Sequence, residues 1–338
     1  MPLRFSDNVL LAMPQRRRVL AGLAAGLALG STGAAPALAA PHDYPAKPIT
    51  IVVPFPAGGA SDILARLIGQ KLSERWKQSV VVENRPGASG NIGAAHVARS
   101  RPDGYTLAFM DLTTLAISPS FTKLSYTPTK DLAPVSMVTF SPHLLVVRKD
   151  LPVNNVGELL AYAKEHPGRL SFGATPGTIT QLAGVLLAQK AGISWTYIGY
   201  KGGAQVTTDL VGGHIDVIMN SVLGTYALVD SQQVKMLAVA SAKPFYMYPG
   251  TPTIAQTIPD FVTGTWQGLL APAGTPKAIV QQLHDEVALI LKEPDVMARL
   301  RELGCEPLNE TPEHFGQWLR EQTVYWAGVI KENNVKAD

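Results

Sequence analysis

The stretch Ile49-Thr50-Ile51-Val52-Val53-Pro54-Phe55-Pro56-Ala57-Gly58-Gly59-Ala60-Ser61-Asp62-Ile63 decides the fold. It opens with an uninterrupted run of β-branched and apolar residues, which is typical of a strand buried on both faces. From Ile63 onward, apolar residues return at positions 63, 64, 67, 68 and 72, the spacing of one helix face. The sequence therefore predicts a strand, a glycine loop and a helix.

The loop between this strand and this helix is suited to hold an anion. Two prolines end the strand, Gly58 and Gly59 permit unusual backbone angles, and Ser61 or Asp62 is placed to cap the helix. Such a loop presents free N–H groups at the positive end of a helix dipole. The alternative is an ordinary turn whose glycines serve geometry alone.

Known nucleotide-binding motifs do not fit this loop. It has neither the lysine and hydroxyl residue of GxxxxGK[ST] nor the spacing of GxGxxG, and the later segment Gly87 to Gly93 reads GxxGxxG. The sequence thus argues against phosphate cradling.

The first 39 residues are predicted to be a signal peptide. Arg16-Arg17-Arg18 precede the apolar run Val19 to Leu29, and Ala37-Leu38-Ala39 places small residues before the expected cleavage after Ala39. We therefore expect the protein to be exported to the periplasm.

The start and the export route stay open at this point. Met13 would give an ordinary short n-region and is an alternative start to Met1. The arginine run is compatible with both a general secretory and a twin-arginine signal.

Without the leader the chain is formally neutral. Residues 1–39 hold four Arg and one Asp, which leaves 25 basic and 25 acidic side chains. Nothing in this balance suggests a nucleic-acid partner, because such binding calls for a basic patch.

The length of the mature chain, about 300 residues, predicts two domains of about 150 residues each. The single cysteine, Cys305, excludes an intrachain disulfide and is expected to be a small buried filler.

Strand and helix patterns alternate along the chain, which predicts an α/β fold with parallel sheets. Further strands are expected at Ser79–Asn84, Tyr105–Met110, His143–Arg148, Arg169–Phe172, Trp195–Tyr200, Ile215–Asn220, Lys235–Ala240 and Thr265–Leu270. Further helices are expected at Ile92–Arg99, Val156–Glu165, Gln181–Ala191, Gln205–Val211, Lys277–Lys292, Pro294–Leu303 and Pro312–Glu332.

A second strand-loop-helix unit mirrors the first. Gly173 to Gln181 again joins a strand to a helix through glycines, with three threonines added. Asp111 to Thr114 follow one strand and Asn220 ends another, so they should lie at the carboxyl edge where open α/β sheets bind ligands. Two facing helix N-termini would grip one acid between two domains. We place these domains at 40–140 plus 264–338 and at 141–263, joined by a double hinge.

Catalytic and metal-binding patterns are missing from the sequence. It has no Gly-x-Ser-x-Gly elbow and no HExxH, and the seven histidines stand singly. No cofactor or metal is expected.

Several longer segments make the chain resemble the Bug family, the periplasmic receptors of tripartite tricarboxylate transporters. These segments, which follow the first loop in order through nearly all of the mature chain, are Val82 to Ala88, Pro102 to Leu107, Tyr200-Lys201-Gly202, Asp209 to Asp216 and Trp266 to Pro276.

The resemblance implies a two-domain, type II periplasmic-binding-protein fold that closes on a small carboxylate and offers it to a membrane permease. It implies a carboxylate held by backbone groups and waters at the first loop, with hydroxyl and amide contacts from the second. We expect a monomer whose ligand-binding residues are Phe55, Pro56, Ala57, Gly58, Gly59, Ser61, Asp62, Thr113, Thr175, Thr178, Thr180, Gln181, Asn220 and Trp266.

The chain departs from the family pattern at two positions. The family usually has Gly-x-Gly-x-x-x-His in the second loop, where this chain has Thr175-Pro176-Gly177 and Gln181, and a glycine after Met110, where it has Asp111. A carboxylate pointing inward at position 111 would repel a multiply charged acid, so we expect a mono- or dicarboxylic ligand, an amino or aromatic acid included. The alternatives are a receptor that feeds a sensor kinase and an exported hydrolase or lyase that uses Asp62.

Overall fold

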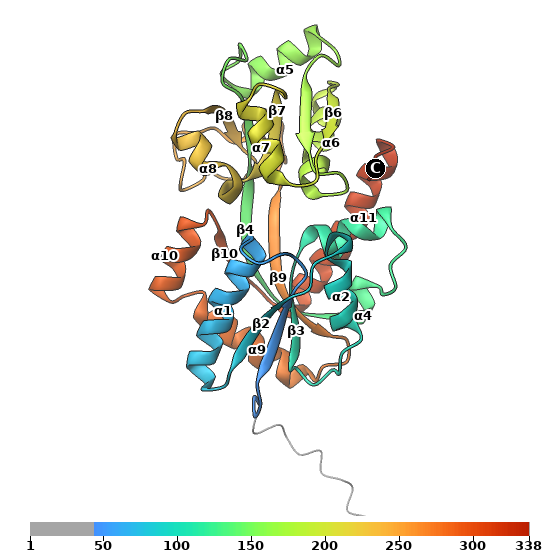
Figure 1. The fold of residues 1–338 in the computed structure, drawn as a ribbon, viewed down its shortest axis with the longest axis vertical. Coiled ribbons are helices and arrows are strands. Elements are labelled where there is room, and N and C mark those ends of the chain that lie inside the picture. The colour runs from blue at the N-terminus through green and yellow to red at the C-terminus, as the bar shows by residue number, and fades with distance from the viewer. Residues whose placement is uncertain (1–43, 338) are drawn as a thin grey trace, which may run out of the picture. The chain divides into compact units, whose positions relative to one another are not determined.

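The computed structural model describes residues 44–337, which form a mixed α/β fold (Figure 1). Its ten strands form one sheet: eight follow the order β2-β1-β3-β9-β4-β7-β5-β6, and β8 and β10 lie off this path and pair with β4. The strands are β1 Ile49–Val53, β2 Val80–Asn84, β3 Thr106–Asp111, β4 Leu132–Arg148, β5 Ser171–Ala174, β6 Thr196–Gly199, β7 Val217–Ser221, β8 Val234–Val239, β9 Gly264–Pro272 and β10 Glu306–Glu310.

Helices surround the sheet in the upper and in the lower part of the molecule as drawn in Figure 1. They are α1 Ala60–Trp76, α2 Asn91–Ala98, α3 Ser118–Phe121, α4 Pro128–Asp131, α5 Val156–Glu165, α6 Ile179–Ala191, α7 Gly203–Val211, α8 Val222–Asp230, α9 Lys277–Ile290, α10 Pro294–Glu302 and α11 Pro312–Glu332. Strand β1 is buried along nearly its whole length, as its run of apolar residues predicts.

Strand β4 changes its partners part-way along. Its residues from Leu132 to Pro142 pair with β9, whereas those from His143 onward pair with β7 and β8. We therefore call β1 to β3, β10 and their helices the first half, and β5 to β8 with α5 to α8 the second half. Figure 1 shows β4 and β9 running between the two.

A buried histidine sits where β4 changes partners. The His143 ring is fully buried, and its Nδ1 lies 3.3 Å from the Thr263 hydroxyl just before β9. Burial lowers the pKa of His143 to about 3, because the charged imidazolium would lose its hydration there. The ring is therefore neutral in the folded protein at ordinary pH.

Three features differ from the sequence prediction. The sheet is not parallel throughout, since β9 runs antiparallel to both β3 and β4. Strand β4 begins at Leu132 rather than His143. Pro134 and Pro142 argue against a strand in the sequence, but the segment that contains them pairs with β9. Helix α8 and strand β10 were not predicted at all.

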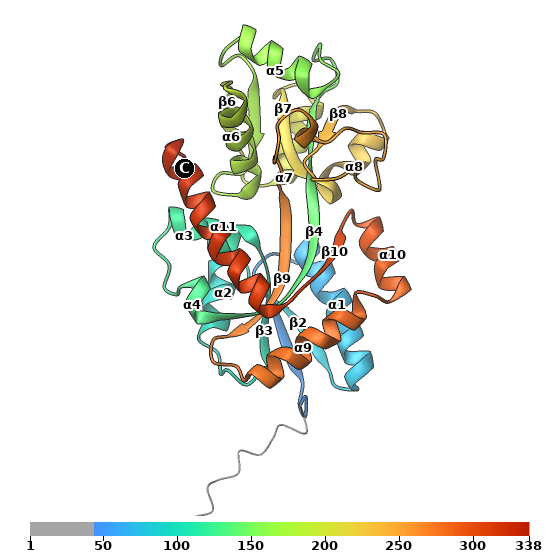
Figure 2. The same cartoon turned by 180° about the vertical axis from the view of Figure 1, so that it is seen from behind.

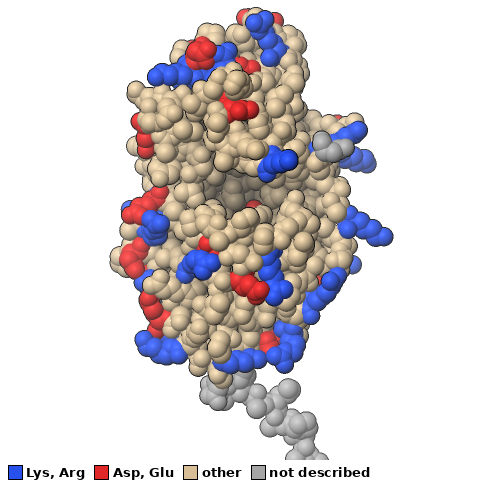
Figure 3. Space-filling model, viewed as in Figure 1, with Lys and Arg blue, Asp and Glu red and all other residues tan. Residues whose placement is uncertain are grey.

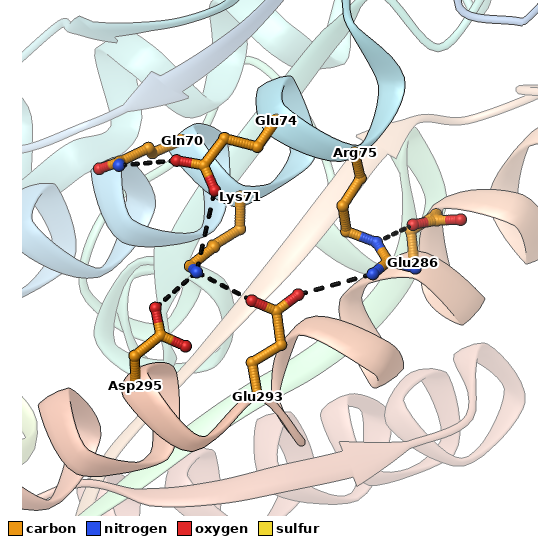
Figure 4. Close-up of polar contacts among 7 residues, drawn as sticks. All are labelled: Gln70, Lys71, Glu74, Arg75, Glu286, Glu293 and Asp295. Atoms are coloured by element: carbon orange, nitrogen blue, oxygen red, sulfur yellow. Dashed lines mark hydrogen bonds and ion pairs between the residues drawn. The ribbon is translucent and has the colours of Figure 1, made fainter.

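Helix α1, which carries the first loop, is tied to the C-terminal helices by ion pairs (Figure 4). Lys71 contacts Glu293 at 2.9 Å and also Asp295, while Arg75 contacts Glu286 and lies 3.5 Å from Glu293. Hydrogen bonds with the two acidic partners raise the pKa of Lys71. The network fixes α1 against the start of α10.

The C-terminal helix α11 reaches from the first half to the second (Figure 2). Gln189 on α6 donates to Glu332 at 2.9 Å, and Gln181 Nε2 donates to the Lys336 carbonyl at 3.4 Å. The end of the chain therefore lies against the helix that begins at the second loop.

Candidate functional site

A pocket of about 560 Å³ opens between the two halves, which is within the range of small-molecule sites. Figure 3 shows the hollow, with few charged side chains at its rim. Its walls come from both glycine loops, from the ends of β3 and β7 and from the turn before α7. The carboxyl ends of parallel strands thus meet at one site, as expected of an open α/β sheet.

The first loop has a different cap from the predicted one. Gly59, not Ser61 or Asp62, is the N-cap of α1, and no side chain caps the helix. Gly58 has φ +84°, and its N–H donates to Asp62 Oδ2 at 2.9 Å. Asp62 therefore holds the loop from inside, in the first turn of the helix.

The Asp62 carboxylate is fully engaged within the protein. It accepts hydrogen bonds from Arg66 Nε at 3.0 Å and Asn84 Nδ2 at 2.9 Å, and Asn84 also donates to the Phe55 carbonyl. Burial alone would raise the pKa of Asp62, but these hydrogen bonds and the Arg66 charge lower it below its usual range. Asp62 lies outside the pocket, so the structure gives no support to an enzyme that uses it.

The second loop repeats this plan with neutral groups. Gly177 has φ +70°, and its N–H donates to Gln181 Oε1 at 2.8 Å. Thr178 is the N-cap of α6, and its hydroxyl donates to the Thr175 carbonyl and contacts Thr180 Oγ1 at 2.8 Å. The three threonines line the pocket, whereas Gln181 faces the C-terminal segment.

One hydrogen bond joins the two halves at the pocket. The Ile179 N–H, in the first turn of α6, donates to Thr113 Oγ1 at 3.4 Å. Thr113 follows β3 in the first half and is itself buried. The start of the helix that follows the second loop is thereby joined to the segment that follows β3 in the first half.

Trp266 points away from the pocket. Its ring packs against Phe140 and Trp318, with centroids 4.5 and 5.5 Å away. Its neighbours Thr265 and Gln267 face the pocket side instead, because successive side chains of a strand alternate between its faces. Gln267 is buried, and its Oε1 has no hydrogen-bond partner among the described residues.

The predicted site residues thus fall into three groups. Within the pocket lie Phe55, Pro56, Thr113, Thr175, Thr178, Thr180 and Asn220. An adjoining, more open pocket of about 740 Å³ at the start of α1 is lined by Ala57, Gly59 and Ser61. Outside both lie Gly58, Asp62, Gln181 and Trp266. Ligand contact by any of them stays a prediction.

Several lining residues were missed or left unassigned by the sequence analysis. Ser89 and Gly90 belong to the GxxGxxG segment, and Gly90 has φ +90° with Thr114 so close that a Cβ would meet its hydroxyl at 2.5 Å. Asp111 and Lys201 are the charged residues among those that line the pocket. Burial raises the pKa of Asp111, although Thr114 donates to it. For Ser89 and Gly90, the GxxGxxG spacing was the signal in the sequence that could have predicted a place in the pocket wall.

Comparison with known proteins decides the family. The family described as the tripartite tricarboxylate transporter family receptor matches residues 64–335. The chain belongs to this family. Protein BugT of Bordetella pertussis is 31% identical over 318 residues, covering 92% of this receptor and 96% of BugT.

Two solved structures share the fold of this receptor. Rpa4515 of R. palustris with adipate has a TM-score of 0.77 and 34% identity, covering 87% of this chain and 99% of its own. MatC (Rpa3494) from Rhodopseudomonas palustris with bound malate has a TM-score of 0.72 and 32% identity, covering 85% and 100%.

These comparisons confirm the Bug-family resemblance and the two-domain binding-protein fold. The family consists of solute receptors rather than enzymes. Among the described helices, none has the length and apolar character needed to cross a membrane. The predicted signal peptide, with its cleavage after Ala39, lies outside the described residues.

Proposed function

We propose that this chain is a periplasmic receptor that binds a small mono- or dicarboxylic acid in the pocket between its halves. The observation that carries the proposal is that two glycine loops, each leading into the N-terminus of a long helix, line this pocket or the pocket that adjoins it. The adipate and malate bound to the two R. palustris neighbours support the same ligand class.

The two loops meet the charge of the ligand through their backbone. Each helix N-terminus carries about half a positive charge, worth about 0.3–1 kcal/mol to an exposed anion and up to about 2 kcal/mol when partly buried. Neither loop contains a lysine or arginine. This supply suits one carboxylate at each end of a ligand better than a cluster of three.

The two halves act as domains that close on the ligand, divided as 40–140 plus 264–338 and 141–263. The change of partners along β4 between Pro142 and His143 supports a hinge at this place. Small-angle scattering with saturating ligand is expected to show compaction, and an unchanged radius of gyration would contradict closure.

The loaded receptor delivers its acid to the membrane permease subunits of a tripartite tricarboxylate transporter. It is exported with a signal peptide removed after about Ala39, and it works as a monomer. A neighbouring two-component system in place of permease genes would favour the sensor-kinase alternative.

A thermal-shift screen of mono-, di- and tricarboxylates, followed by calorimetry, tests the ligand class. A ligand at one hundred times its Kd adds about 2.7 kcal/mol to native stability, so a true ligand raises Tm visibly. We expect mono- or dicarboxylates to bind most tightly. Citrate binding more tightly than every smaller acid would refute this expectation, and the absence of any acid ligand would refute the proposed function.

A further inference from the structure

Two opposite charges face the pocket from its two halves. Asp111 ends β3 in the first half, and Lys201 lies between β6 and α7 in the second. Both residues also line the adjoining pocket at the start of α1, where they are again the charged members of the wall. They therefore stand where the two pockets meet.

Asp111 is held in place without being neutralised. Thr114 donates to Asp111 Oδ1 from its N–H at 3.1 Å and from its hydroxyl at 3.3 Å. Thr114 itself is fully buried, and its single hydroxyl proton is shared between Asp111 Oδ1 and the Ser89 carbonyl, which lies 3.2 Å away. No cation among the described residues offsets the burial of Asp111: burial raises its pKa, and the hydrogen bonds from Thr114 lower it only in part.

Asp62 provides the contrast within the same half of the protein. Its carboxylate accepts from Arg66, Asn84 and the Gly58 N–H, and its pKa is lowered. The negative charge of Asp62, behind the loop, is thus balanced by a cation. The negative charge of Asp111, at the wall of the pocket, is not. Asp111 is partly buried and has no cation beside it, which is unfavourable for a carboxylate, so a bound molecule that brings a cation would be preferred.

The charge balance of the pocket points the same way. Lys201 and two helix N-termini of about half a charge each oppose Asp111, leaving about one positive charge. A plain dicarboxylate carries two negative charges and would also repel Asp111. An acid with an amine next to a carboxylate lowers its own net charge and supplies the missing cation.

We propose, building on the proposed function, that Asp111 is a specificity-determining residue that accepts a hydrogen bond from a protonated amine of the ligand. The receptor is accordingly selective for amine-bearing acids over the same acids without the amine. The ligand carboxylate lies toward the start of α1 and Lys201, and the amine lies toward the end of β3.

Calorimetry with matched ligand pairs tests this inference. The pairs are glutamate with glutarate, aspartate with succinate, and alanine with propionate, and malate replaces the amine of aspartate by a hydroxyl. In at least one pair the amine-bearing acid is expected to bind about tenfold to a hundredfold more tightly, the range of one charge-assisted hydrogen bond. Malate is expected to bind no better than succinate, because a hydroxyl brings no charge.

Three variants assign the selectivity to its residue. Asp111→Asn, which keeps the size of the side chain, is expected to abolish or invert the preference within the pair. Lys201→Gln is expected to weaken both members of a pair alike and to leave their ratio unchanged. Asp285→Asn, an exposed aspartate of α9, is the matched control and is expected to change neither.

The outcomes separate this inference from the proposed function. Acids that bind with no preference for the amine, or a preference that survives Asp111→Asn, overturn the role of Asp111 but leave the carboxylate receptor intact. Failure of every acid to bind overturns both.

Discussion

The loop before α1 and the loop before α6 share one backbone plan but anchor it with different chemistry. In each, a glycine of positive φ donates its N–H to the side chain four residues later, at 2.9 Å to Asp62 and at 2.8 Å to Gln181. The residue after the glycine is the N-cap in both, Gly59 in one and Thr178 in the other.

The difference lies in what each anchor needs around it. The charge of the Asp62 carboxylate is balanced by Arg66, and the carboxylate also accepts from Asn84 of β2. Asn84 in turn donates to the Phe55 carbonyl. Gln181 is neutral and needs no charged partner. Its amide nitrogen makes one long hydrogen bond, to the Lys336 carbonyl. The first loop is thus fixed by a charged network and the second by hydroxyls and the end of the chain.

The largest expected effect comes from removing the charged anchor. Asp62→Ala leaves the Gly58 N–H without its acceptor and Arg66 without its ion pair, and is expected to lower the free energy of unfolding by about 2–3 kcal/mol. The matched variant Gln181→Ala should cost only about 1 kcal/mol, the value of a neutral hydrogen bond. Urea unfolding followed by circular dichroism measures both, and equal losses would show that the charge of the anchor does not matter.

Glycine substitution distinguishes ligand binding from folding. Gly58→Val is expected to lower ligand affinity at least about tenfold while costing about 1–2 kcal/mol of stability, the penalty of a left-handed conformation. No atom lies near the added Cβ, so crowding contributes nothing. Gly177→Val should cost more stability, because its Cβ would lie 3.2 Å from Ala337. Unchanged affinity of Gly58→Val by calorimetry would remove the first loop from the site.

The pH dependence of stability should reveal the charged anchor. The pKa of Asp62 is lowered on folding, so its contribution is complete above its unfolded pKa of about 3.9 and is lost as pH falls through its folded pKa. Asp62→Asn is expected to make the acid limb shallower without removing it, because the pKa values of Asp103, Asp150, Asp216 and Asp295 are lowered as well. Gln181→Ala should leave the limb unchanged. An acid limb that is unchanged in Asp62→Asn would contradict the assignment.

His143 acts in a different pH window and must be separated from Asp62. The unfolded chain takes up a proton near pH 6.5 that the folded ring accepts only near pH 3, so stability falls as pH drops through that interval. The slope is about 1.4 kcal/mol per pH unit. It should persist in Asp62→Asn and disappear in His143→Gln, as followed by urea unfolding between pH 7 and pH 3.

The smallest effect is expected from shortening the chain. Deleting residues 336–338 removes the acceptor at Lys336 and the Ala337 side chain that lies near Gly177, for a loss below about 1 kcal/mol. Hydrogen exchange should become faster at the Gly177 amide and stay unchanged at the Gly58 amide. Faster exchange at both amides would mean that the two loops are not anchored independently.

The sequence predicts the backbone of the site better than the direction of its side chains. The runs Ile49–Val53 and Gly173 to Gln181 locate both loops, because strand, glycine and helix patterns are local. The side chains of Asp62 and Gln181 were expected to face the ligand. Instead, each accepts a hydrogen bond from the N–H of the glycine four residues earlier in its own loop.

The phase of a strand is the second limit. Alternation places either Trp266 or its neighbours in the pocket, and only the packing of Phe140 and Trp318 on one face decides between them. The first part of β4 was missed because its two prolines argue against a strand. The strand forms because it pairs with β9, which lies far away in the sequence.

The exchange of partners along β4 also sets an order of assembly during synthesis. The strands β5 to β8 pair only with one another and with the later part of β4, so one continuous segment can complete the second half. Strand β3 must wait for β9, whose Leu269 pairs with Phe109, and until then its edge stays open. Contacts so distant along the chain form slowly, which leaves the first half as the portion most exposed to aggregation while the nascent protein is still incomplete.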